Sequence, residues 1–440
     1  MQALGDVVST LAEELELPGA SVGLLHDGKE HYAYHGVTSI DNPLPVDERT
    51  LFLCGSTTKT FTATAVMRLV EQRLVDLDAR VRTYLPDFRV DDEAAAESVT
   101  VLQLLNHTAG WDGDFFKNTG DGADALARYV EAMAGLRQLT SPGAVVSYNN
   151  ASFGVAGRLV ETLSELPYEE ALRALVLEPL GLENTMFVSR EILTRRFVVD
   201  HQRRQDGGTT VLTLGFPRSG NAIGGLATTA RDLVAWARFH LHDGLSQMQE
   251  PTVHAPGWSQ GDAVGIGWLL SEAGGLRVVG HGGATAGQLS LFKTVPERNF
   301  ALVSCTNCSP VGSAFNERIM RWAWERLLES PIPEPETVAR SAEEVAAFCG
   351  RYETVAYTVT VVPAGDGVSL EVVDRPETLA ELGIDPEPDP PIPFAFRADA
   401  DDRIVCVEPP HRGSSGFFIR DDSGEVTALN AFGRHTPRTQ

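Results

Sequence analysis

The chain comprises 440 residues, of which 43% are hydrophobic and 22% are charged. This composition is typical of a globular protein with one large domain and a smaller one. The formal net charge is -24, with 36 lysine and arginine residues against 60 aspartate and glutamate residues. Such an acidic chain is a poor partner for nucleic acid, which is bound by neutralising its phosphates, and for anionic membranes.

The N-terminal stretch MQALGDVVSTLAEELELPGA has no basic segment and no apolar run of signal-peptide length. No stretch of the sequence reaches the roughly 18 apolar residues of a membrane-spanning helix. The cysteines are few and scattered, and the single C-x-x-C at Cys305 and Cys308 lacks the further ligands of a zinc site. We therefore expect a cytoplasmic protein that needs neither a metal nor an organic cofactor.

The first elements along the chain are predicted to be a helix and a hairpin. Apolar residues at helical spacing predict an amphipathic helix over residues 2–16. Two apolar runs then flank His26-Asp-Gly-Lys29, and Asp-Gly between such runs is typical of a tight hairpin turn. The histidines at 26, 31 and 35 lack an acidic partner, and we expect them on the surface of these strands.

The stretch from Leu51 to Leu74 carries the first chemical motif, and it predicts a short strand, a turn at Gly55 and a helix with one buried face. Ser56 and Lys59 stand three residues apart at the start of this helix, so that the hydroxyl and the amine can face each other. A lysine whose pKa is lowered by burial or by nearby positive charge can remove the serine proton. The N–H groups of a helix start, including that of Ser56, suit an oxyanion. The same tetrapeptide also fits a capping serine beside a solvated lysine.

Residues 99–111 predict a short helix that ends at His107-Thr-Ala-Gly110, with Gly110 as the stop signal. We interpret His107 as structural, because histidines at helix ends commonly bind the last carbonyls. The loop that follows, 112–124, is rich in glycine, aspartate and asparagine. It either borders a substrate cleft or is a surface loop.

The second chemical motif is Tyr148-Asn149-Asn150, directly before a helix predicted over residues 151–163. These polar residues can be helix caps. A tyrosine beside a lysine can instead serve as base and acid, and the amide of Asn150 can orient a substrate amide. Further helices are predicted over 167–177 and after Thr229, where Thr229 and Asp232 resemble a capping box.

The third motif is His281-Gly282-Gly283-Ala284, which ends a predicted strand and is followed by two more strands. Glycines weaken a strand unless something must approach its backbone closely. The N–H of Ala284 is therefore a candidate for a second oxyanion donor, with His281 at the strand edge beside it. The alternative is a bulged edge strand with a surface histidine.

The last part of the chain differs in character. The sequence Ser330-Pro-Ile-Pro-Glu-Pro predicts a stiff linker. A short helix and repeated short strands with turn signals follow, which predict a small β-barrel or curled sheet, and we expect the proline-rich insert 374–393 to be a loop. The predicted organisation is a catalytic domain of residues 1–329, a linker of residues 330–340 and a C-terminal domain of residues 341–440.

Together, the motifs resemble the S-x-x-K, Y-x-N and H-x-G signatures of the class C β-lactamase-like family within the penicillin-binding-protein and β-lactamase superfamily. The phrases LLNHTAG, EPLGLENTMF and GGLATTARDL also resemble family segments, and the resemblance covers roughly residues 5–328. It implies an α+β fold in which an antiparallel sheet is flanked by helices and an all-helical subdomain. CGRYE at 349–353 resembles the opening of the lipocalin-like accessory domain of some members, which implies a small C-terminal β-barrel.

The resemblance also implies a role for each motif residue. Ser56 resembles the acylated nucleophile, Lys59 its base, and Tyr148 the residue that moves the proton to and from the leaving group. Asn150 matches the amide that contacts the substrate and holds Lys59. The remaining positions are implied to bind the substrate, with the N–H groups of Ser56 and Ala284 as the oxyanion hole; these positions are His281, Gly283 and Ala284.

Histidine at 281 departs from the lysine of β-lactamases, and a mostly neutral imidazole grips a carboxylate less well than a cation. Family members with H-x-G act as esterases, D-amino-acid peptidases, or acyl and peptidyl transferases. We therefore predict a serine hydrolase that acts on an ester or amide carbonyl of a small molecule or peptide through an acyl-serine intermediate. The alternatives are an acyl or peptidyl transferase or cyclase with the same acyl-enzyme, and a catalytically silent binding protein.

Overall fold

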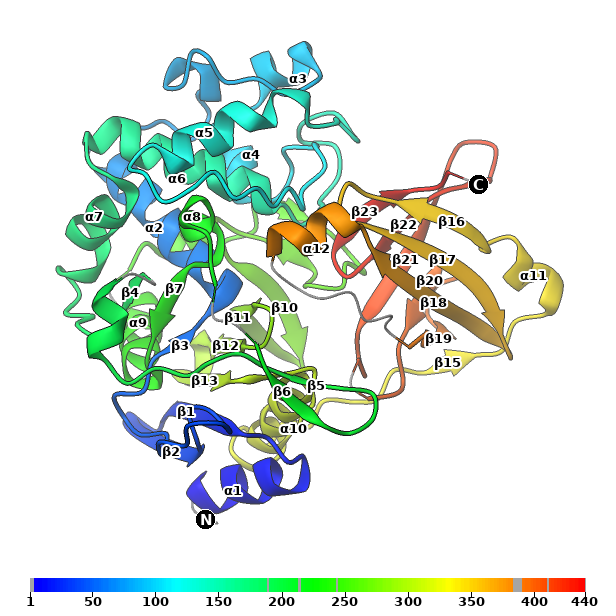
Figure 1. Cartoon of the computed structure of the whole chain (residues 1–440). Helices are drawn as coiled ribbons and strands as arrows, with labels where there is room; N and C mark the ends of the chain where they lie inside the picture. Colours follow the sequence, from blue (N-terminus) through cyan, green and yellow to red (C-terminus); the bar gives the residue numbers. More distant parts are fainter. Residues whose placement is uncertain are drawn as a thin grey trace.

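The structure is a computed structural model that describes residues 4–187, 190–212, 215–242, 244–382, 390–409 and 411–439. Its centre is an antiparallel sheet of eight strands (Figure 1). The N-terminal hairpin pairs with β13, so the start of the chain completes a sheet whose other strands come much later. In spatial order the strands are β2 (Lys29–Gly36), β1 (Gly19–His26), β13 (Phe300–Thr306), β12 (Leu289–Val295), β11 (Leu276–Ala284), β10 (Leu269–Ala273), β9 (Ala263–Val264) and β8 (Val253–His254).

The first helix and hairpin form where the sequence predicts them. The helix α1 covers Leu4–Glu14. His26 pairs with Lys29 across the turn, and Asp27 and Gly28 both have positive φ, at 50° and 70°, as a two-residue hairpin turn requires. The strand histidines are exposed or partly exposed, which confirms that they are surface residues.

Helices cover both faces of the sheet, as the alternation of side chains along β1 requires. Ala20, Val22 and Leu24 belong to a buried cluster with α1 and α10 (Val311–Arg326). Gly23 points to the other face, where a Cβ would lie 2.7 Å from Val234 of α9 (Ala230–His242). The sheet is therefore the middle layer of a three-layer body.

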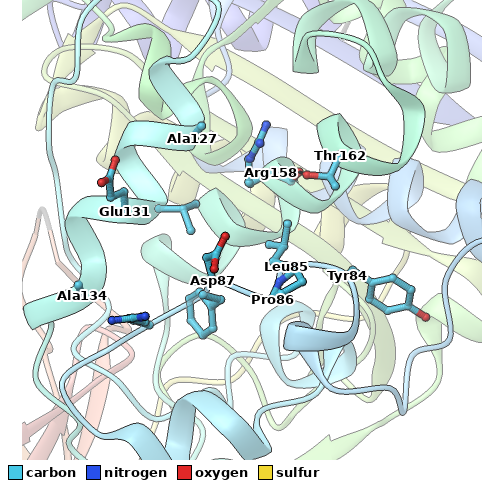
Figure 2. A pocket seen from close by; sticks show the side chains of 12 residues that line it. Tyr84, Leu85, Pro86, Asp87, Ala127, Glu131, Ala134, Arg158 and Thr162 are labelled. Atoms are coloured by element: carbon cyan, nitrogen blue, oxygen red, sulfur yellow. Dashed lines mark hydrogen bonds between the residues drawn. The ribbon is translucent and has the colours of Figure 1, made fainter.

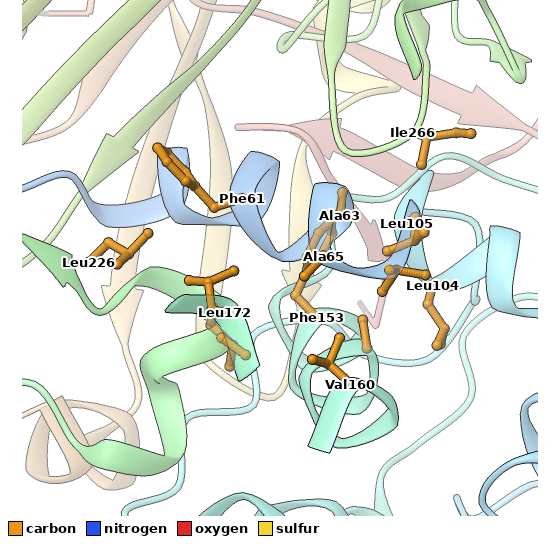
Figure 3. Packing of buried hydrophobic residues seen from close by; sticks show 14 of the residues in the cluster. Phe61, Ala63, Ala65, Leu104, Leu105, Phe153, Val160, Leu172, Leu226 and Ile266 are labelled. Atoms are coloured by element: carbon orange, nitrogen blue, oxygen red, sulfur yellow. The ribbon is translucent and has the colours of Figure 1, made fainter. Parts of the chain in front are cut away.

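The helix α2 (Thr58–Glu71) runs through the largest hydrophobic cluster. Ala65 lies next to Phe153 of a neighbouring helix (Figure 3), and the Phe61 ring stacks on Trp236 of α9 with ring centroids 4.0 Å apart. The helix is buried on nearly all sides rather than on the one predicted face, because its threonines satisfy their hydroxyls internally; Thr60, for example, donates to the Thr57 carbonyl at 2.8 Å. The predicted last residue, Leu74, lies beyond the helix and is 46% exposed.

A group of helices lies beyond one face of the sheet and forms the predicted all-helical subdomain (Figure 1). Its members are α3 (Glu93–Ser98), α4 (Val101–Leu105), α5 (Ala125–Ala132), α6 (Asn150–Ser164), α7 (Tyr168–Leu172) and α8 (Asn221–Gly224). The structure also has two small sheets. One joins β3 (Phe52–Leu53), β7 (Leu226–Thr228) and β4 (Met186–Phe187), and the other joins β14 (Cys308–Ser309), β5 (His201–Arg203) and β6 (Thr209–Val211).

The C-terminal strands form a separate sheet that curls into a nearly closed barrel with its own hydrophobic cluster. Tyr352 of the first strand bridges to Arg438 after the last strand, and the Thr439 N–H donates to the Arg351 carbonyl at 2.7 Å. In order, the strands are β16 (Gly350–Glu353), β17 (Tyr357–Ala364), β18 (Gly367–Asp374), β19 (Ile392–Arg397), β20 (Arg403–Val405), β21 (Ser415–Arg420), β22 (Val426–Ala431) and β23 (Arg434–Pro437), and β15 (Thr337–Val338) pairs with β19. The short helix α11 (Ala342–Ala346) precedes them.

Two local predictions are wrong. Pro376–Leu382 forms a helix, α12, where the sequence predicts a loop, because proline is well tolerated in the first turn of a helix; residues 383–389 of the same insert lie outside the described residues. Thr229 accepts the Asp232 N–H, but the Asp232 carboxylate binds Asn184 and Thr185 instead of closing a capping box. None of the described helices is long and apolar enough to cross a bilayer.

Acid should destabilise the core at His240, whose ring packs among Trp236, Phe239 and Trp268 and whose nitrogens have no hydrogen-bond partner in the described part of the chain. Burial lowers the pKa of His240 from 6.5 to about 3. The unfolded chain therefore takes up a proton there as the pH falls below about 6.5, while the folded chain stays neutral, so the free energy of unfolding should decrease by at most about 1.4 kcal/mol per pH unit.

Chemical denaturation between pH 4 and 8 checks this, with His240→Leu as the comparison. The variant should lose part of the pH dependence, since it has no imidazole to protonate on unfolding. An unchanged pH dependence in His240→Leu would show that this histidine is not held neutral.

Candidate active site

Ser56 lies in a 3₁₀ turn, Gly55–Thr57, between β3 and α2. The sequence places it at the start of the helix, and the structure places it just before the first α-helical residue. Lys59 is the second residue of α2, with none of its surface exposed. Its Nζ lies 3.0 Å from Ser56 Oγ and donates to the Ile223 carbonyl at 2.9 Å. The amine therefore faces the hydroxyl, as the three-residue spacing predicts.

The second motif reaches the same place from the helical subdomain. Tyr148 precedes α6 and is 4% exposed. Lys59 Nζ lies 5.1 Å from the centroid of the Tyr148 ring, and the Tyr148 hydroxyl interacts with Ser56. Asn149 is the helix cap, since its side chain accepts the Ser152 N–H at 2.9 Å. Asn149 is thus the residue that caps the helix, and the Tyr148 side chain is directed toward Ser56 and Lys59 instead.

Burial decides the protonation of these groups. Desolvation lowers the pKa of the Lys59 amine well below its usual range, and the charge of Arg434 lowers it further, whereas Asp114 opposes this. Desolvation also raises the pKa of the Tyr148 phenol, against smaller opposing effects of Ser56 and Arg434. Both shifts favour the uncharged form, which for the amine is the form that can accept a proton from Ser56 and for the phenol is the form that can donate one.

The third motif brings His281 to the Tyr148 hydroxyl. His281 is 1% exposed on β11, an inner strand between β10 and β12, so it is neither on an edge strand nor on the surface. Burial first, and then the charge of Lys59, lower the pKa of His281 to about 3. Its Nδ1 lies 2.5 Å from the Gly282 carbonyl, to which it donates, and this leaves Nε2 as an acceptor 3.5 Å from the Tyr148 hydroxyl. A neutral His281 orients the phenol and offers no positive charge.

Close contact between two backbones sets the region predicted to be the oxyanion hole. A Cβ on Gly283 would lie 1.9 Å from the Cys54 carbonyl and 2.8 Å from the Ser56 nitrogen, and a Cβ on Gly55 would lie 2.6 Å from the Ala284 nitrogen. Only glycine allows such an approach. The end of β11 therefore lies directly against the Ser56 turn, which brings the N–H groups of Ser56 and Ala284 to one place.

Asn150 has a different partner from the one that the family resemblance implies. Its side-chain N–H donates to Asp114 at 2.6 Å, whereas Lys59 Nζ donates to the Ile223 carbonyl. Asp114 in turn binds Arg434 with both carboxylate oxygens, at 2.9 and 3.2 Å. Sequence reasoning missed Asp114 and Arg434; the only signal was the aspartate-rich loop 112–124, which does border the site.

His107 is structural, but not through helix carbonyls. The helix α4 ends at Leu105, and His107 has a positive φ of 62°. Its Nδ1 accepts the Asn149 N–H at 3.0 Å, and its ring lies 4.4 Å from that of Tyr148. His107 therefore helps to position Tyr148, through its ring contact with Tyr148 and its hydrogen bond to the next residue, Asn149.

A cavity of about 200 Å³ adjoins the cluster. Ile223 and Ala284, which contact Lys59 and the Ser56 turn, line one side of it. The rest of its lining includes four aromatic side chains, those of Phe115, Phe116, Tyr129 and Phe216, together with the charged pair of Lys117 and Glu381. An apolar group attached to a carbonyl at Ser56 can therefore enter this cavity.

A larger cavity, of about 650 Å³, lies elsewhere, between the 84–89 segment, α5 and α6 (Figure 2). Its lining includes Asp87, Glu131 and Arg158 but no motif residue, so we place the chemistry at the smaller one. Among the described residues, no group of three or more His, Cys, Asp or Glu side chains is arranged to hold a metal ion.

The fold and the site are those of the penicillin-binding-protein and β-lactamase superfamily, with an antiparallel sheet, a helical subdomain, and a serine beside a buried lysine between them. A family model described as Beta-lactamase matches residues 4–323, and the chain belongs to this family. At the level of the family, the protein is a serine hydrolase that works through an acyl-serine. Among curated relatives, Penicillin-binding protein 4 of Amycolatopsis lactamdurans is 33% identical over 364 residues, which are 78% of this chain and 95% of that protein.

Solved structures share the fold over nearly the whole chain. SurE is 25% identical with a TM-score of 0.75, over 99% of this chain and 98% of that one. The octameric penicillin-binding protein homologue from Pyrococcus abyssi is 22% identical with a TM-score of 0.64, over 97% of each chain. Both matches extend through the C-terminal barrel, so the two-part architecture is shared with them.

The glycine contact gives a sharp prediction. Gly283→Ala should reduce acylation of Ser56 by at least about 100-fold, because the new methyl group would overlap the Cys54 carbonyl and push the oxyanion donors apart. Gly282→Ala is the matched control, since a Cβ there would meet its nearest neighbour, the Ser290 carbonyl, at 3.5 Å. Acylation rates from rapid-quench mass spectrometry check this; equal rates in the two variants would contradict the close-contact account.

Proposed function

We propose that the protein is a serine hydrolase that acts on a peptide or peptide-like ester or amide whose acyl residue carries a bulky apolar side chain. The observation that carries this proposal is that the cluster of Ser56, Lys59 and Tyr148 adjoins a cavity with four aromatic side chains in its lining. The cluster and the cavity meet at Ile223 and Ala284.

The proposed reaction follows from the protonation states. The neutral Lys59 amine takes the proton of Ser56 as Oγ attacks the carbonyl carbon, and the N–H groups of Ser56 and Ala284 stabilise the oxyanion. The intermediate collapses as Tyr148 gives its proton to the leaving group, with His281 Nε2 orienting the phenol. Water then attacks the acyl-serine and gives one proton to the Tyr148 phenolate; Ser56 Oγ takes its proton back from Lys59 as the acid is released.

A second acceptor, an amine of the same or another molecule, is the alternative to water. The C-terminal barrel favours this alternative, because its β22–β23 turn binds the backbone of Tyr148 and covers that side of the cluster. A site shielded from water gives a bound amine a better chance to compete. The same enzyme would then act as a peptidyl transferase or cyclase.

The configuration of the acyl residue is part of the proposal. SurE has also been solved with D-Leu, and that chain matches 99% of this one at 25% identity with a TM-score of 0.72. D-Leu is apolar and of a size that suits a cavity of about 200 Å³. We therefore expect a D-configured apolar residue to be preferred at the acyl position.

The test is intact-protein mass spectrometry after brief exposure to activated esters of N-acetyl-D-leucine and N-acetyl-L-leucine. The wild type should gain one acyl group, faster from the D-ester, and Ser56→Ala should gain none. Adding an amine acceptor then separates hydrolase from transferase by the product formed. An adduct in Ser56→Ala would overturn the nucleophile assignment, and tight binding without any adduct would favour the binding-protein alternative.

Tyr148→Phe should leave the fold intact and slow turnover by at least about 100-fold, the low end of the effect of losing a general acid. The loss should be greater for amide substrates than for activated esters, whose leaving groups need no proton. Steady-state kinetics on a matched amide and ester measure it. Equal losses on both substrates would rule out proton donation by Tyr148.

Phe216→Ala should raise KM for the leucyl ester roughly tenfold, because one aromatic wall of the cavity is lost. KM for an acetyl ester, which does not fill the cavity, should stay unchanged. Phe197→Ala is the control, as this partly buried phenylalanine packs against a different cluster around Leu51 and Met186. An equal effect on both esters would place the acyl side chain elsewhere.

A further inference from the structure

The C-terminal barrel reaches the active site through one tight turn. The strands β22 and β23 are joined by Phe432 and Gly433, and Ala431 pairs directly with Arg434. Both turn residues have positive φ, at 53° and 81°, as in other two-residue hairpin turns. A Cβ on Gly433 would lie 2.7 Å from Gln260, so the turn fits tightly against the catalytic part of the chain.

The backbone of this turn holds the backbone of the catalytic tyrosine. The Gly433 carbonyl accepts the N–H of Tyr148 at 2.7 Å and the indole N–H of Trp258 at 2.8 Å. The His435 N–H donates to the hydroxyl of Ser147 at 3.0 Å. Tyr148 and the residue before it, Ser147, are therefore hydrogen-bonded to the barrel.

Arg434 continues from this turn toward the tyrosine ring. Its guanidinium carbon lies 4.6 Å from the centroid of the Tyr148 ring. Nε and Nη2 donate to the two oxygens of Asp114, and Nη1 donates to the Phe432 carbonyl at 2.6 Å. Asp114 is 6% exposed and also accepts the Asn150 amide, so the four groups form one network.

We propose that Arg434 is a positioning residue for the acylation step: locked by Asp114, its guanidinium fixes Tyr148 and Asn150 and supplies positive charge beside the Lys59 amine. The barrel then completes the active site instead of merely covering it. This inference rests on the proposed acyl-serine function, because it assigns Arg434 to the step that Lys59 and Tyr148 perform.

The charges around the amine support this assignment. Arg434 acts on Lys59 in the direction that keeps the amine neutral, and Asp114 acts in the opposite direction with a smaller effect. Removing Arg434 alone would leave the Asp114 carboxylate uncompensated, which favours protonated Lys59. Besides Lys59, Tyr148 and Asp114 themselves, the titratable groups of the described residues that interact with this network include His107, His281, Tyr357, Asp112 and Tyr129.

The hydrogen bonds of Arg434 argue against binding of a substrate carboxylate as its main role. Three of its nitrogens already donate within the protein, two of them to a buried carboxylate that balances the charge. A substrate anion would have to displace Asp114 from Arg434. That would leave the buried Asp114 carboxylate without its partner, and the free-energy cost would exceed what a solvent-exposed ion pair with the substrate would gain.

The first test is the pH dependence of the acylation rate with the N-acetyl-D-leucine ester, between pH 5 and 10. In Arg434→Gln the acid limb should move up by at least about one pH unit, with a rate roughly tenfold lower at a fixed pH on that limb. Asp114→Asn should move the limb the other way, and the double variant should return toward the wild type. Arg420→Gln is the matched control, because this arginine of the same barrel pairs with Asp402 and lies 5.0 Å from the Phe348 ring.

The second test needs no turnover. The chain has only four lysines, at 29, 59, 117 and 293, so NMR of lysine-labelled protein gives four signals, and Lys59→Met identifies one of them. The Lys59 signal should titrate at higher pH in Arg434→Gln than in the wild type. An unshifted titration, or a loss of acylation that is equal at every pH, would overturn the inference. Failure of the wild type to acylate would count against the proposed function, while the titration would still decide the role of Arg434.

Discussion

A lysine amine without exposed surface is the feature on which the rest of the site depends. Removing an ammonium group from water is costly, and a buried lysine therefore holds its amine neutral, which is the form that can accept a proton from serine. Lys59 lies in α2, a helix buried on nearly all sides, and its amine is hydrogen-bonded to Ser56 and to a backbone carbonyl and lies over the Tyr148 ring. The helical subdomain, the sheet and the barrel each place a residue near that amine: Ile223, His281 and Arg434, respectively.

The second constraint is the approach of β11 to the Ser56 turn. Gly55 and Gly283 remove the two side chains that would keep these backbones apart. The same contact brings His281 to the Tyr148 hydroxyl, so one glycine-mediated junction serves both the oxyanion and the proton donor. Because burial lowers the pKa of His281 to about 3, this position offers no positive charge to a substrate anion, which agrees with the proposed apolar acyl group.

Much of the fold and the site was accessible from sequence because the information is local. The hairpin turn at Asp27-Gly28, the helix after Ser56 and the spacing of Ser56 and Lys59 depend on neighbours within a few residues. The pair of Asp114 and Arg434 spans 320 positions, and no periodicity or motif marks it. Likewise, α12 was hidden because its proline-rich composition resembles that of a loop, and His107 was given the wrong partner because Asn149 comes from a distant segment.

The central claim is that Ser56 becomes acylated during turnover. Trypsin should release residues 50–59 as one peptide, TLFLCGSTTK, after cleavage at Arg49 and Lys59. We would quench the reaction with the N-acetyl-D-leucine ester in acid and locate the acyl group in this peptide by fragmentation. The account predicts that the added mass lies on Ser56. Turnover with no adduct in this peptide, or an adduct on Cys54 or a neighbouring threonine, would contradict it.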